Sequence, residues 1–458
     1  MTGTGRAVRD AIVVGGGIAG LTAAWYLRDR DVLVLEAEPR VGGRIRSEPR
    51  DPYWLNLGAH VFSGPGSETW RLAEEVGVEL ARVPGELVAV ELNGHIVSGG
   101  RPELYPFRLP LSLRDRLALV RAGLRLKRAV AGYERASEPR PGEAPETTRQ
   151  RVLAYGDDRT FADWLGPLSG DAAALFRATV TRSTAEMDEI AFGHGAGYFS
   201  LVWNAGKGLS FNVVGGAGTL VDGIAAALGD RVRVDAPVRE IATNGENVRV
   251  RYVEEGSERV ELAREVVVAT KAFDAARIAV DLPDETRRAL EAIPYGPTVV
   301  MAMGTGETGP MPWDGLYALA TPKRAFSMLF NVANVLRPRS IERLPGGSLM
   351  VYRSGHGGLE LMERSDAEIE RAFLDDLAAI FPEARGIVTE TQLLRLPRML
   401  PYAAPGRASL QPALGRALGR IHLAGDYLGG VYVETAIATG HAAAQAISSS
   451  SPRELVGS

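Results

Sequence analysis

The stretch that decides the fold is Ala11-Ile-Val-Val-Gly15-Gly16-Gly17-Ile-Ala-Gly20, an apolar run that breaks into a G-x-G-x-x-G pattern. A helix-like apolar pattern over 21–27 follows it, and a second apolar run, 32–35, ends at Glu36. A strand, a glycine turn, a helix and a strand ending in an acid predict a dinucleotide-binding βαβ unit. The three glycines of the pattern would permit a tight turn, a close approach to a pyrophosphate and close helix–strand packing.

The start of the predicted helix is suited to an anion. The first N–H groups of a helix, here those of Ile18 and Ala19, point at a phosphate, and the positive end of the helix dipole stabilises it. The carboxylate of Glu36 would accept hydrogen bonds from ribose hydroxyls. The alternative is a structural turn without a ligand, but the strand, the helix and the acid stand in register, which favours nucleotide binding.

A second glycine pair, Gly42-Gly43, precedes Arg44 and follows shortly after Ala37. It can wrap the pyrophosphate from the far side, where Arg44 would donate charge-assisted hydrogen bonds. This pairing resembles the flavoprotein superfamily of flavin amine oxidases, protoporphyrinogen oxidases and carotenoid desaturases. The resemblance implies that the ligand is FAD, with Ala37 and Gly43 among the residues that bind it.

The far end of the chain carries a matching motif, in which a short apolar strand, 420–424, ends in Gly425-Asp426 and a helix-like run extends to Ile447. In the resembled family the acid after Ala-Gly binds the ribityl chain of FAD, a role that would fall to Asp426. The following helix N-terminus points at the flavin pyrimidine ring and stabilises the anionic reduced flavin. The residues whose backbone would take this role are Val433, Glu434 and Thr435.

Segments in the middle of the chain also resemble the family. The stretch 57–62 resembles the loop that passes the flavin face, most closely that of plant-type carotenoid desaturases. The glycine-rich stretch 214–220 resembles the start of a helix, and within 233–241 the backbone of Val238 would contact adenine. The cofactor-binding candidates in the first of these loops are Gly58, Ala59 and His60.

The predicted fold is α/β overall, with a Rossmann-like FAD-binding domain of the glutathione-reductase and amine-oxidase type and a mixed sheet-and-helix substrate domain. Both domains are expected to be discontinuous. The FAD-binding domain would comprise 1–95, 205–290 and 390–447, and the substrate domain would comprise 96–204, which is mainly helical, and 291–389. A mobile loop is expected at 136–145 and a disordered tail at 448–458.

Composition narrows the classes of function. A chain of 458 residues with 45% hydrophobic and 24% charged residues suits a globular protein of two domains, and its net charge of −4 gives no reason to expect nucleic acid. The chain has no cysteine, which excludes thiolate metal sites, iron–sulfur clusters and a cysteine-tethered flavin. Its scattered histidines suggest no metal site. Non-covalent FAD is the simplest expectation without cysteine, with a histidine-tethered flavin as the alternative. A cytoplasmic location is expected because no signal peptide or membrane-spanning run is visible.

The segment 113–131 has leucines at helical spacing and is rich in arginine. A basic amphipathic helix can lie against a membrane and admit an apolar substrate, as this region sometimes does in the resembled enzymes. The simpler interpretation is a solvated helix with its apolar face on the substrate domain, and we favour it because a charged outer face is typical of surface helices.

Flavin chemistry needs few acid–base residues, because the protein mainly places a C–H bond over the ring and excludes water. The candidates near the flavin are His60, a titratable group, and Tyr432, which could form half of an aromatic cage. Each has a structural role as an alternative. Two further residues that could line the cavity are Tyr402 and Arg398. Amine oxidases of the family usually carry a lysine near flavin N5, but Val300 or a neighbour occupies that position here.

The leading hypothesis is an FAD-dependent oxidase or desaturase that moves a hydride to flavin N5 from a mid-sized apolar or conjugated organic substrate, as protoporphyrinogen oxidases or desaturases do. The alternatives are a flavin monoamine or polyamine oxidase that makes an imine and hydrogen peroxide, and a non-catalytic flavin-binding scaffold or sensor. An amino-acid oxidase is disfavoured, since no arginine is obviously placed to clamp a carboxylate. The single fingerprint indicates that the substrate reduces the flavin, with oxygen or a quinone as electron acceptor.

Overall fold

The computed structural model describes residues 8–168, 170–204, 208–340, 342–430 and 432–450. The predicted βαβ unit is present as β1 (Arg9–Val14), α1 (Ile18–Tyr26) and β2 (Val32–Leu35), with β1 parallel to β2. Every residue of β2 is buried, as is typical of a parallel strand covered on both faces.

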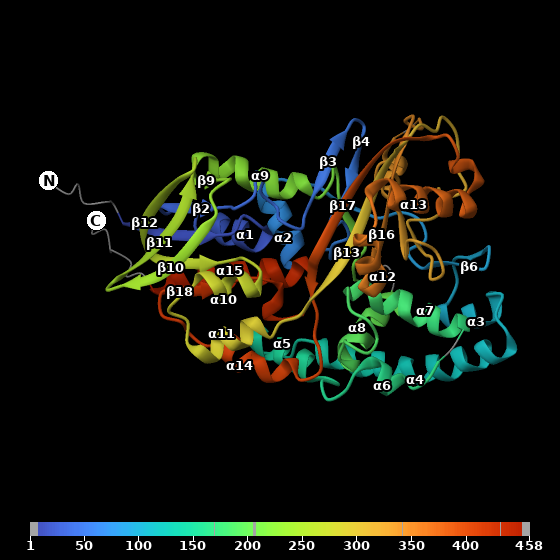
Figure 1. Ribbon diagram of the computed structural model, residues 1–458, viewed down its shortest axis with the longest axis horizontal. Coiled ribbons are helices and arrows are strands. Elements are labelled where there is room, and N and C mark those ends of the chain that lie inside the picture. The colour runs from blue at the N-terminus through green and yellow to red at the C-terminus, as the bar shows by residue number, and fades with distance from the viewer. Residues whose placement is uncertain (1–7, 169, 205–207, 341, 431, 451–458) are drawn as a thin grey trace.

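The first sheet has the strand order β10-β11-β12-β1-β2-β9, with β18 beside β12. It joins segments from the start, the middle and the end of the chain, so the nucleotide-binding domain is discontinuous, as predicted (Figure 1). The other strands of this sheet are β9 (Val232–Arg233), β10 (Val238–Asn244), β11 (Asn247–Glu254), β12 (Ser257–Val268) and β18 (Ile421–Leu423).

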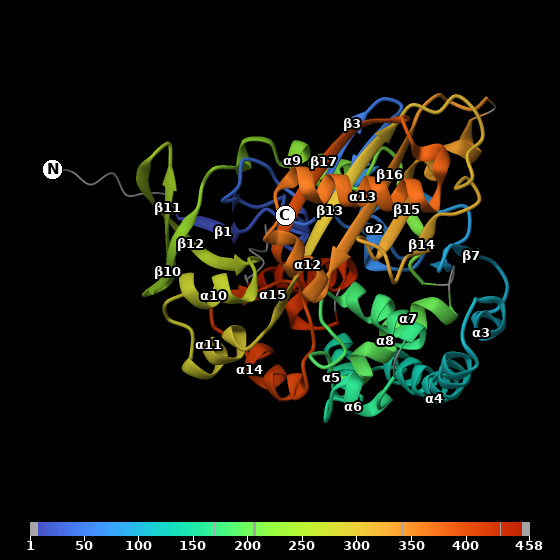
Figure 2. The same ribbon diagram turned by 45° about the vertical axis from the view of Figure 1, so that its right-hand side comes forward.

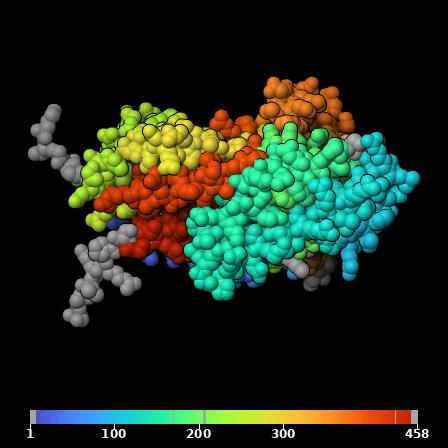
Figure 3. Space-filling view, turned by 90° about the horizontal axis from the view of Figure 1, so that it is seen from below, coloured from blue at the N-terminus to red at the C-terminus, as the bar shows by residue number. Residues whose placement is uncertain are grey.

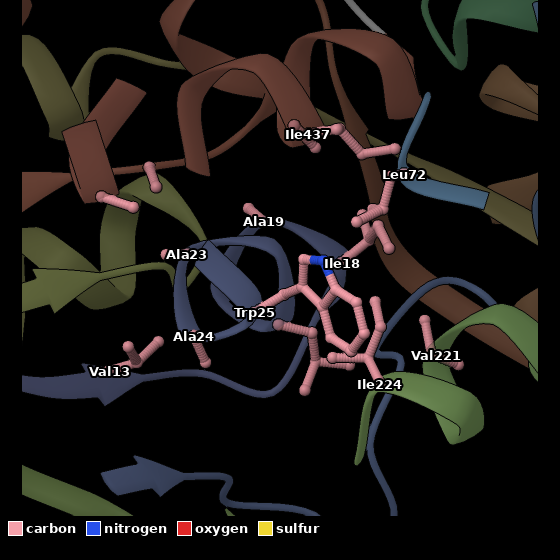
Figure 4. Packing of buried hydrophobic residues seen from close by; sticks show 14 of the residues in the cluster. Val13, Ile18, Ala19, Ala23, Ala24, Trp25, Leu72, Val221, Ile224 and Ile437 are labelled. Carbon is pink, nitrogen blue, oxygen red and sulfur yellow. The ribbon is translucent and has the colours of Figure 1, made fainter. Parts of the chain in front are cut away.

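Helix α1 is buried between this sheet and the helices α9 (Gly218–Leu228) and α15 (Val433–Ser450). It is apolar on all sides because neighbours cover every face; Figure 4 shows its Trp25 side chain packed against Ile224 of α9. Helix α15 can come this close because Gly440 faces it, where a Cβ would stand 2.1 Å from the carbonyl oxygen of Ala19. The N-termini of α1 and α15 are thereby fixed relative to each other.

The second sheet has the strand order β17-β13-β16-β15-β14-β6-β7. Helix α13 (Asp366–Ile380) covers one face, where Phe373 and Leu377 pack on alternate residues of β13, and Figure 2 shows the helix lying across the strands. The opposite face packs on β4 (Tyr53–Asn56) and carries Val300 and Tyr317. The strands are β6 (Ala89–Leu92), β7 (His95–Val97), β13 (Tyr295–Thr305), β14 (Ala318–Ala320), β15 (Met328–Asn331), β16 (Gly347–Ser354) and β17 (Val388–Pro401).

A helical layer fills most of 96–204, as predicted, and lies below the second sheet in Figure 1. Its core is rich in aromatic rings, among them Phe161, Phe176 and Phe199. Its helices are α3 (Tyr105–Arg108), α4 (Leu113–Ser137), α5 (Pro145–Ala154), α6 (Phe161–Leu165), α7 (Gly170–Val180) and α8 (Phe192–Trp203).

The remaining elements connect these layers. They are α2 (Glu68–Val76), α10 (Ala272–Ile278), α11 (Asp284–Glu291), α12 (Gly355–Met362), α14 (Gln411–Leu414), β3 (Ser47–Arg50), β5 (Leu80–Arg82) and β8 (Phe211–Val213). Among the described residues, no helix is both long enough and apolar enough to cross a bilayer.

The structure adjusts three sequence-based boundaries. Strands β6 and β17 belong to the second sheet, so a division by sheets falls before 95 and after 390, and the domain limits themselves stay a prediction. Helix α4 continues through the buried Ala136 to Ser137, which shortens the loop predicted at 136–145. Helix α15 reaches Ser450, which corrects the start of the tail predicted at 448; residues 451–458 lie outside the described chain.

Candidate active site

Two of the three fingerprint glycines are explained by the protein chain itself. Gly15 has φ +105°, which favours glycine, and a Cβ there would stand 2.8 Å from the carbonyl oxygen of Ala269. A Cβ on Gly20 would stand 2.0 Å from the carbonyl oxygen of Gly15. Both residues are therefore required for the strand, turn and helix to pack, with or without a ligand.

Gly17 is different, because nothing in the protein requires it to be glycine. Its φ of −72° and ψ of 172° suit any residue, and no atom lies within 4 Å of the position of a Cβ. It stands at the N-terminus of α1, where backbone N–H groups bind phosphates. An open volume at this point fits a ligand that approaches the backbone closely.

The second glycine pair lies directly beside Gly17. The amide of Gly42 donates to the carbonyl oxygen of Gly16 at 2.8 Å, and Gly43 has φ +54° with the position of its Cβ 3.5 Å from the Cα of Gly17. The two loops thus lie side by side. We call the residues 15–20 and 41–44 together the cradle.

An acid closes the cradle on one side. The buried carboxylate of Glu36 accepts hydrogen bonds from the amides of Gly16 at 2.5 Å and Glu38 at 2.9 Å. The chain beside it leads to Val238, since Ala236 donates its amide to the carbonyl oxygen of Glu36 at 2.8 Å. Ala37 is exposed between them. The predicted ribose and adenine positions thus lie next to each other.

Arg44 and Asp426 join the two ends of the chain. Arg44 donates from Nη1 and Nη2 to the two carboxylate oxygens of Asp426 at 2.6 and 2.8 Å, and from Nη1 to the carbonyl oxygen of Met399 at 3.1 Å. The side chain of Asp426 is only 4% exposed. The preceding Gly425 is fixed by a hydrogen bond from its amide to Thr439 Oγ1 at 2.9 Å. The roles predicted for Arg44 on the pyrophosphate and Asp426 on the ribityl chain stay predictions.

At the start of α15, side chain and backbone have separate functions. The carboxylate of Glu434 accepts from the amides of Glu68 at 2.5 Å and Thr69 at 3.1 Å, so it caps α2. The amide of Thr435 donates to the carbonyl oxygen of Tyr432 at 3.1 Å. A helix leaves its first N–H groups without an intrahelical acceptor, so those of Val433 and Glu434 are the donors suited to a ligand here.

The loop 57–62 connects the cradle to the interior. Ala59 donates its amide to the carbonyl oxygen of Arg44 at 3.3 Å, and a Cβ on Gly58 would stand 2.2 Å from that same oxygen. The next residue, His60, is buried and lies edge-on to Phe330, with 4.5 Å between ring centroids. One short loop therefore contacts both the cradle and the second sheet.

His60 is a neutral imidazole with one free nitrogen. Its Nδ1 lies 3.1 Å from the carbonyl oxygen of Gly58, to which it can donate a proton, and its buried Nε2 has no partner in the described chain. The pKa of His60 is lowered to about 4, chiefly by burial; the hydrogen bond to Gly58 raises it and the nearby charge of Arg182 lowers it. Nε2 is therefore an acceptor at neutral pH.

A cavity of about 390 Å³ lies between the helical layer and the second sheet. Most of its lining is apolar, and the rings of Tyr317 and Phe330 bring it against His60. Glu103 and Lys127 also line it and form an exposed ion pair with 2.6 Å between Oε1 and Nζ. Representative apolar residues of the lining are Val61, Leu119, Phe176, Phe199 and Met328.

Sequence analysis missed Arg182, the other charged residue of the lining. No arginine had seemed placed to bind a carboxylate, because Arg182 lies in an ordinary polar stretch, Thr181-Arg-Ser-Thr, without a motif around it. Only the packing of α7 against the second sheet could reveal its position.

The remaining predicted residues divide between the interior and the surface. The ring of Tyr432 lies 5.8 Å from that of Tyr198, and its φ of +103° is unusual for a non-glycine residue. Burial raises the pKa of Tyr402 to about 12. Arg398 is exposed and stacks on Phe273 at 4.3 Å, outside the cavity lining, so its catalytic role stays a prediction without support from its position. Tyr402 and Tyr432 likewise stay predictions.

The position predicted to correspond to the family lysine lies on β13, among apolar residues. Val300 lies in the middle of β13, paired with Tyr352 on β16 and Leu394 on β17, and its side chain joins the cluster on the sheet face that carries Tyr317. Among the described residues, no group of three or more potential ligands could hold a metal ion.

Comparison with known proteins agrees with this geometry. Residues 18–448 match the family described as flavin containing amine oxidoreductase. Flavin-containing amine oxidase B of Sus scrofa is 32% identical over 255 residues, which are 53% of this chain and 46% of that protein. Flavin-containing amine oxidase A of Bos taurus is 27% identical over 315 residues, 64% of this chain and 56% of that protein. The chain thus spans about half the length of the curated relatives it matches.

Solved structures match along almost the whole chain. Wild-type putrescine oxidase bound to putrescine has a TM-score of 0.75 at 22% identity, covering 97% of this chain and 99% of that one. Cyclohexylamine oxidase from Brevibacterium oxydans gives the same values. At this identity the likeness establishes the fold, and it confirms the predicted α/β class.

Proposed function

The chain belongs to the flavin-containing amine oxidoreductase family, and from this premise we propose that it is an oxidoreductase that binds FAD non-covalently and oxidises a mid-sized, largely apolar or conjugated organic substrate. The observation that carries the proposal is the loop 57–62. The Ala59 amide donates a hydrogen bond to the carbonyl oxygen of Arg44 in the cradle, and the ring of His60 packs on Phe330, which lines the cavity.

The cradle suits FAD on three counts. Gly17 leaves an open volume at a helix N-terminus, Glu36 is held as an acceptor for a ribose, and α15 presents its first amides towards the same region. Because the chain has no cysteine, a thioether link to the flavin is excluded. When bound, FAD would supply a two-electron acceptor for a hydride from a substrate C–H bond, with oxygen or a quinone as final acceptor.

The residues of the chain would orient the substrate and keep water away. The apolar walls of the cavity desolvate a substrate of matching size and fix its position. The free Nε2 of His60 would accept a hydrogen bond from the substrate. With a pKa of about 4, His60 stays neutral throughout the physiological range.

Amine oxidation is the second candidate, favoured because the relatives and structural neighbours include named amine oxidases. Two observations weigh against it. The family lysine has no counterpart around Val300, and Arg182 adds positive charge to the cavity, which repels an ammonium group. We therefore place a neutral or anionic substrate of the protoporphyrinogen-oxidase or desaturase kind ahead of an amine. A flavin-binding scaffold without turnover is the third candidate.

Anaerobic reduction of the bound flavin distinguishes these candidates. The purified holoprotein is mixed without oxygen with a primary amine, a diamine, a porphyrinogen and a polyene precursor, and bleaching of the flavin absorbance is followed. We expect bleaching by an apolar or conjugated compound. Bleaching by amines alone would establish the second candidate, and no bleaching by any class would favour the scaffold.

A peripheral membrane contact through α3 and α4 is a further part of the proposal. Among the exposed large apolar side chains are those of Leu104, Phe107, Leu113, Leu117 and Leu124, which are 50% to 81% exposed. Phe107 and Leu124 also line the cavity, so this surface adjoins its mouth. In Figure 3 the α3–α4 segment, in cyan, occupies one end of the molecule. Arginines at 114, 121 and 128 on α4 suit an anionic lipid surface.

Liposome flotation tests this contact. We expect the holoprotein to float with vesicles of phosphatidylglycerol and phosphatidylcholine at low salt. The double variant Leu113→Ser, Leu117→Ser should stay in the bottom fraction of the gradient. Leu359→Ser, which removes a leucine of 52% exposure elsewhere, is the matched control. No flotation of the unchanged protein at low salt would dismiss the contact.

A further inference from the structure

The backbone around Arg182 is fixed, so its side chain has a defined direction. Arg182 lies in the turn η2 (Thr181–Ser183) at the end of α7, between Thr181 and Ser183, which are 5% and 0% exposed. The Ser183 hydroxyl donates to the carbonyl oxygen of Val180 at 2.6 Å. Thr184 ends the turn with φ +71°, a conformation that costs a non-glycine residue free energy and persists only where packing imposes it.

The guanidinium of Arg182 lies among groups at the His60 end of the cavity. It makes a hydrogen-bonding contact with Tyr352, and its charge acts on the side chains of His60, Tyr198 and Tyr432. The Nε2 atom of His60 is buried and has no hydrogen-bond partner in the described chain. A positive charge and an unfilled hydrogen-bond acceptor therefore lie close together.

Arg182 differs from the other cations nearby in having no acid beside it. Arg177, five residues earlier on α7, lies 3.4 Å from Glu186, and Lys127 lies 2.6 Å from Glu103. Within the part of the chain that the structure describes, Arg182 takes part in no ion pair of 4 Å or less. A cation in an otherwise apolar wall is costly unless an anion meets it.

We propose that Arg182 is the recognition site for a carboxylate on the substrate, so that this chain acts on an apolar carboxylic acid whose acid group enters the cavity first. The proposal rests on the proposed function, because it assigns the substrate class of the same cavity. A guanidinium binds a carboxylate through two parallel N–H···O hydrogen bonds, which gives orientation as well as affinity. The hydrocarbon part of the acid would fill the apolar lining towards α3 and α4.

Isothermal titration calorimetry of the purified holoprotein with a matched pair of ligands tests this assignment. Decanoate and decanamide have the same chain and differ in the charge of the head group. We expect one decanoate per chain, bound about tenfold to a hundredfold more tightly than decanamide. In Arg182→Met this preference should disappear while the affinity for decanamide changes little, and Arg182→Lys should restore part of it.

The control is Arg177→Met, which removes the same charge from the preceding helix, α7, at a position outside the cavity lining. It should leave the preference for decanoate unchanged. Equal affinities for the two ligands, or a preference that survives Arg182→Met, would overturn the assignment. A loss of flavin from Arg182→Met would also overturn it, because Arg182 would then contribute to FAD binding rather than to recognition of a carboxylate.

Calorimetry needs no turnover, which separates this proposal from the proposed function. An Arg182-dependent preference for decanoate in a protein whose flavin no compound reduces would support the carboxylate site and refute the oxidoreductase. Flavin reduction by neutral compounds, together with equal affinities for decanoate and decanamide, would support the oxidoreductase and refute the carboxylate site.

Discussion

The cradle and the cavity contact the same loop, yet they are built from different parts of the polypeptide. The cradle is made of backbone, namely two glycine turns and the N-terminus of α1, and the carboxylates of Glu36 and Asp426 beside it are already held by hydrogen bonds. The cavity is made of side chains from distant helices and strands, with one cation, Arg182, that has no acid partner in the described chain. Backbone recognition leaves little room for variation, whereas a wall of side chains can change from one substrate to another.

The largest expected effect is the loss of FAD binding from a substitution in the cradle that leaves the fold unchanged. Gly17→Val should fold normally but retain less than about a tenth of the FAD, because its side chain enters a volume that only a ligand would use. We expect the melting temperatures of the flavin-free proteins to differ by no more than about 2 °C. Absorbance of released FAD and thermal unfolding supply the two measurements.

Two other glycines make this prediction specific. Gly315→Val, at an exposed site with an equally open volume, should alter neither property. Gly20→Ala should lower stability whether or not flavin is present, because its Cβ would stand 2.0 Å from a carbonyl oxygen. If Gly17→Val keeps its FAD, the cradle is a structural turn.

A smaller effect is expected at the ion pair that closes the cradle. Asp426→Ala leaves Arg44 without its partner in a largely buried place, which should cost about 3 kcal/mol of unfolding free energy and weaken FAD binding. Glu390→Ala removes the partner of Arg50 in an exposed pair of similar length, 2.9 Å, and should cost less than about 1 kcal/mol. Chemical denaturation measures both; equal losses would mean that the Arg44 pair has no special role.

The smallest effect concerns His60, which stands between the two regions. An unfolded histidine takes up a proton near pH 6.5, whereas buried His60 does so only near pH 4. Between these values the unfolded state binds more protons, so stability falls as the pH is lowered from 6.5 to 4. His60→Gln should flatten this decline when melting temperature is followed against pH.

His194 provides the matched case, because burial lowers its pKa to about 4 as well, but its ring packs on Tyr198, whereas His60 packs on Phe330 of the cavity lining. His194→Gln should flatten the acid decline similarly and leave substrate oxidation unchanged, whereas His60→Gln should slow oxidation. A wild-type protein whose stability does not change over this pH range would contradict the burial of both imidazoles.

The difference between the two regions also explains what the sequence could predict. The βαβ unit, the second glycine pair and the Gly425-Asp426 motif are local patterns, and the structure brings them together as expected. The cavity could not be predicted, because its lining runs from Val61 to Phe330 and depends on how the helical layer packs on the second sheet. Arg182 was missed for this reason, and Arg398 was assigned to the cavity although it lies outside the lining.

The side-chain partners of some motif residues could not be predicted either, because these partners lie far away in the sequence. The backbone of Glu434 stays a predicted contact of the flavin, while its carboxylate caps α2, a contact between residues 366 positions apart that the sequence did not indicate. Arg44 and Asp426 were assigned separate contacts with the cofactor, and the structure shows them bonded to each other across the ends of the chain. Pairings over such distances leave no periodic signal in the sequence.

The most direct test of the central claim is one titration of the holoprotein with decanoate. Two signals are recorded during it: the heat of binding and the visible absorption spectrum of the bound flavin. If the cavity opens onto the cofactor held in the cradle, the flavin bands should shift and saturate at the same decanoate concentration as the heat. Heat that saturates while the flavin spectrum stays unchanged would show that the ligand binds away from the flavin, and the account that joins cradle and cavity through His60 would be wrong.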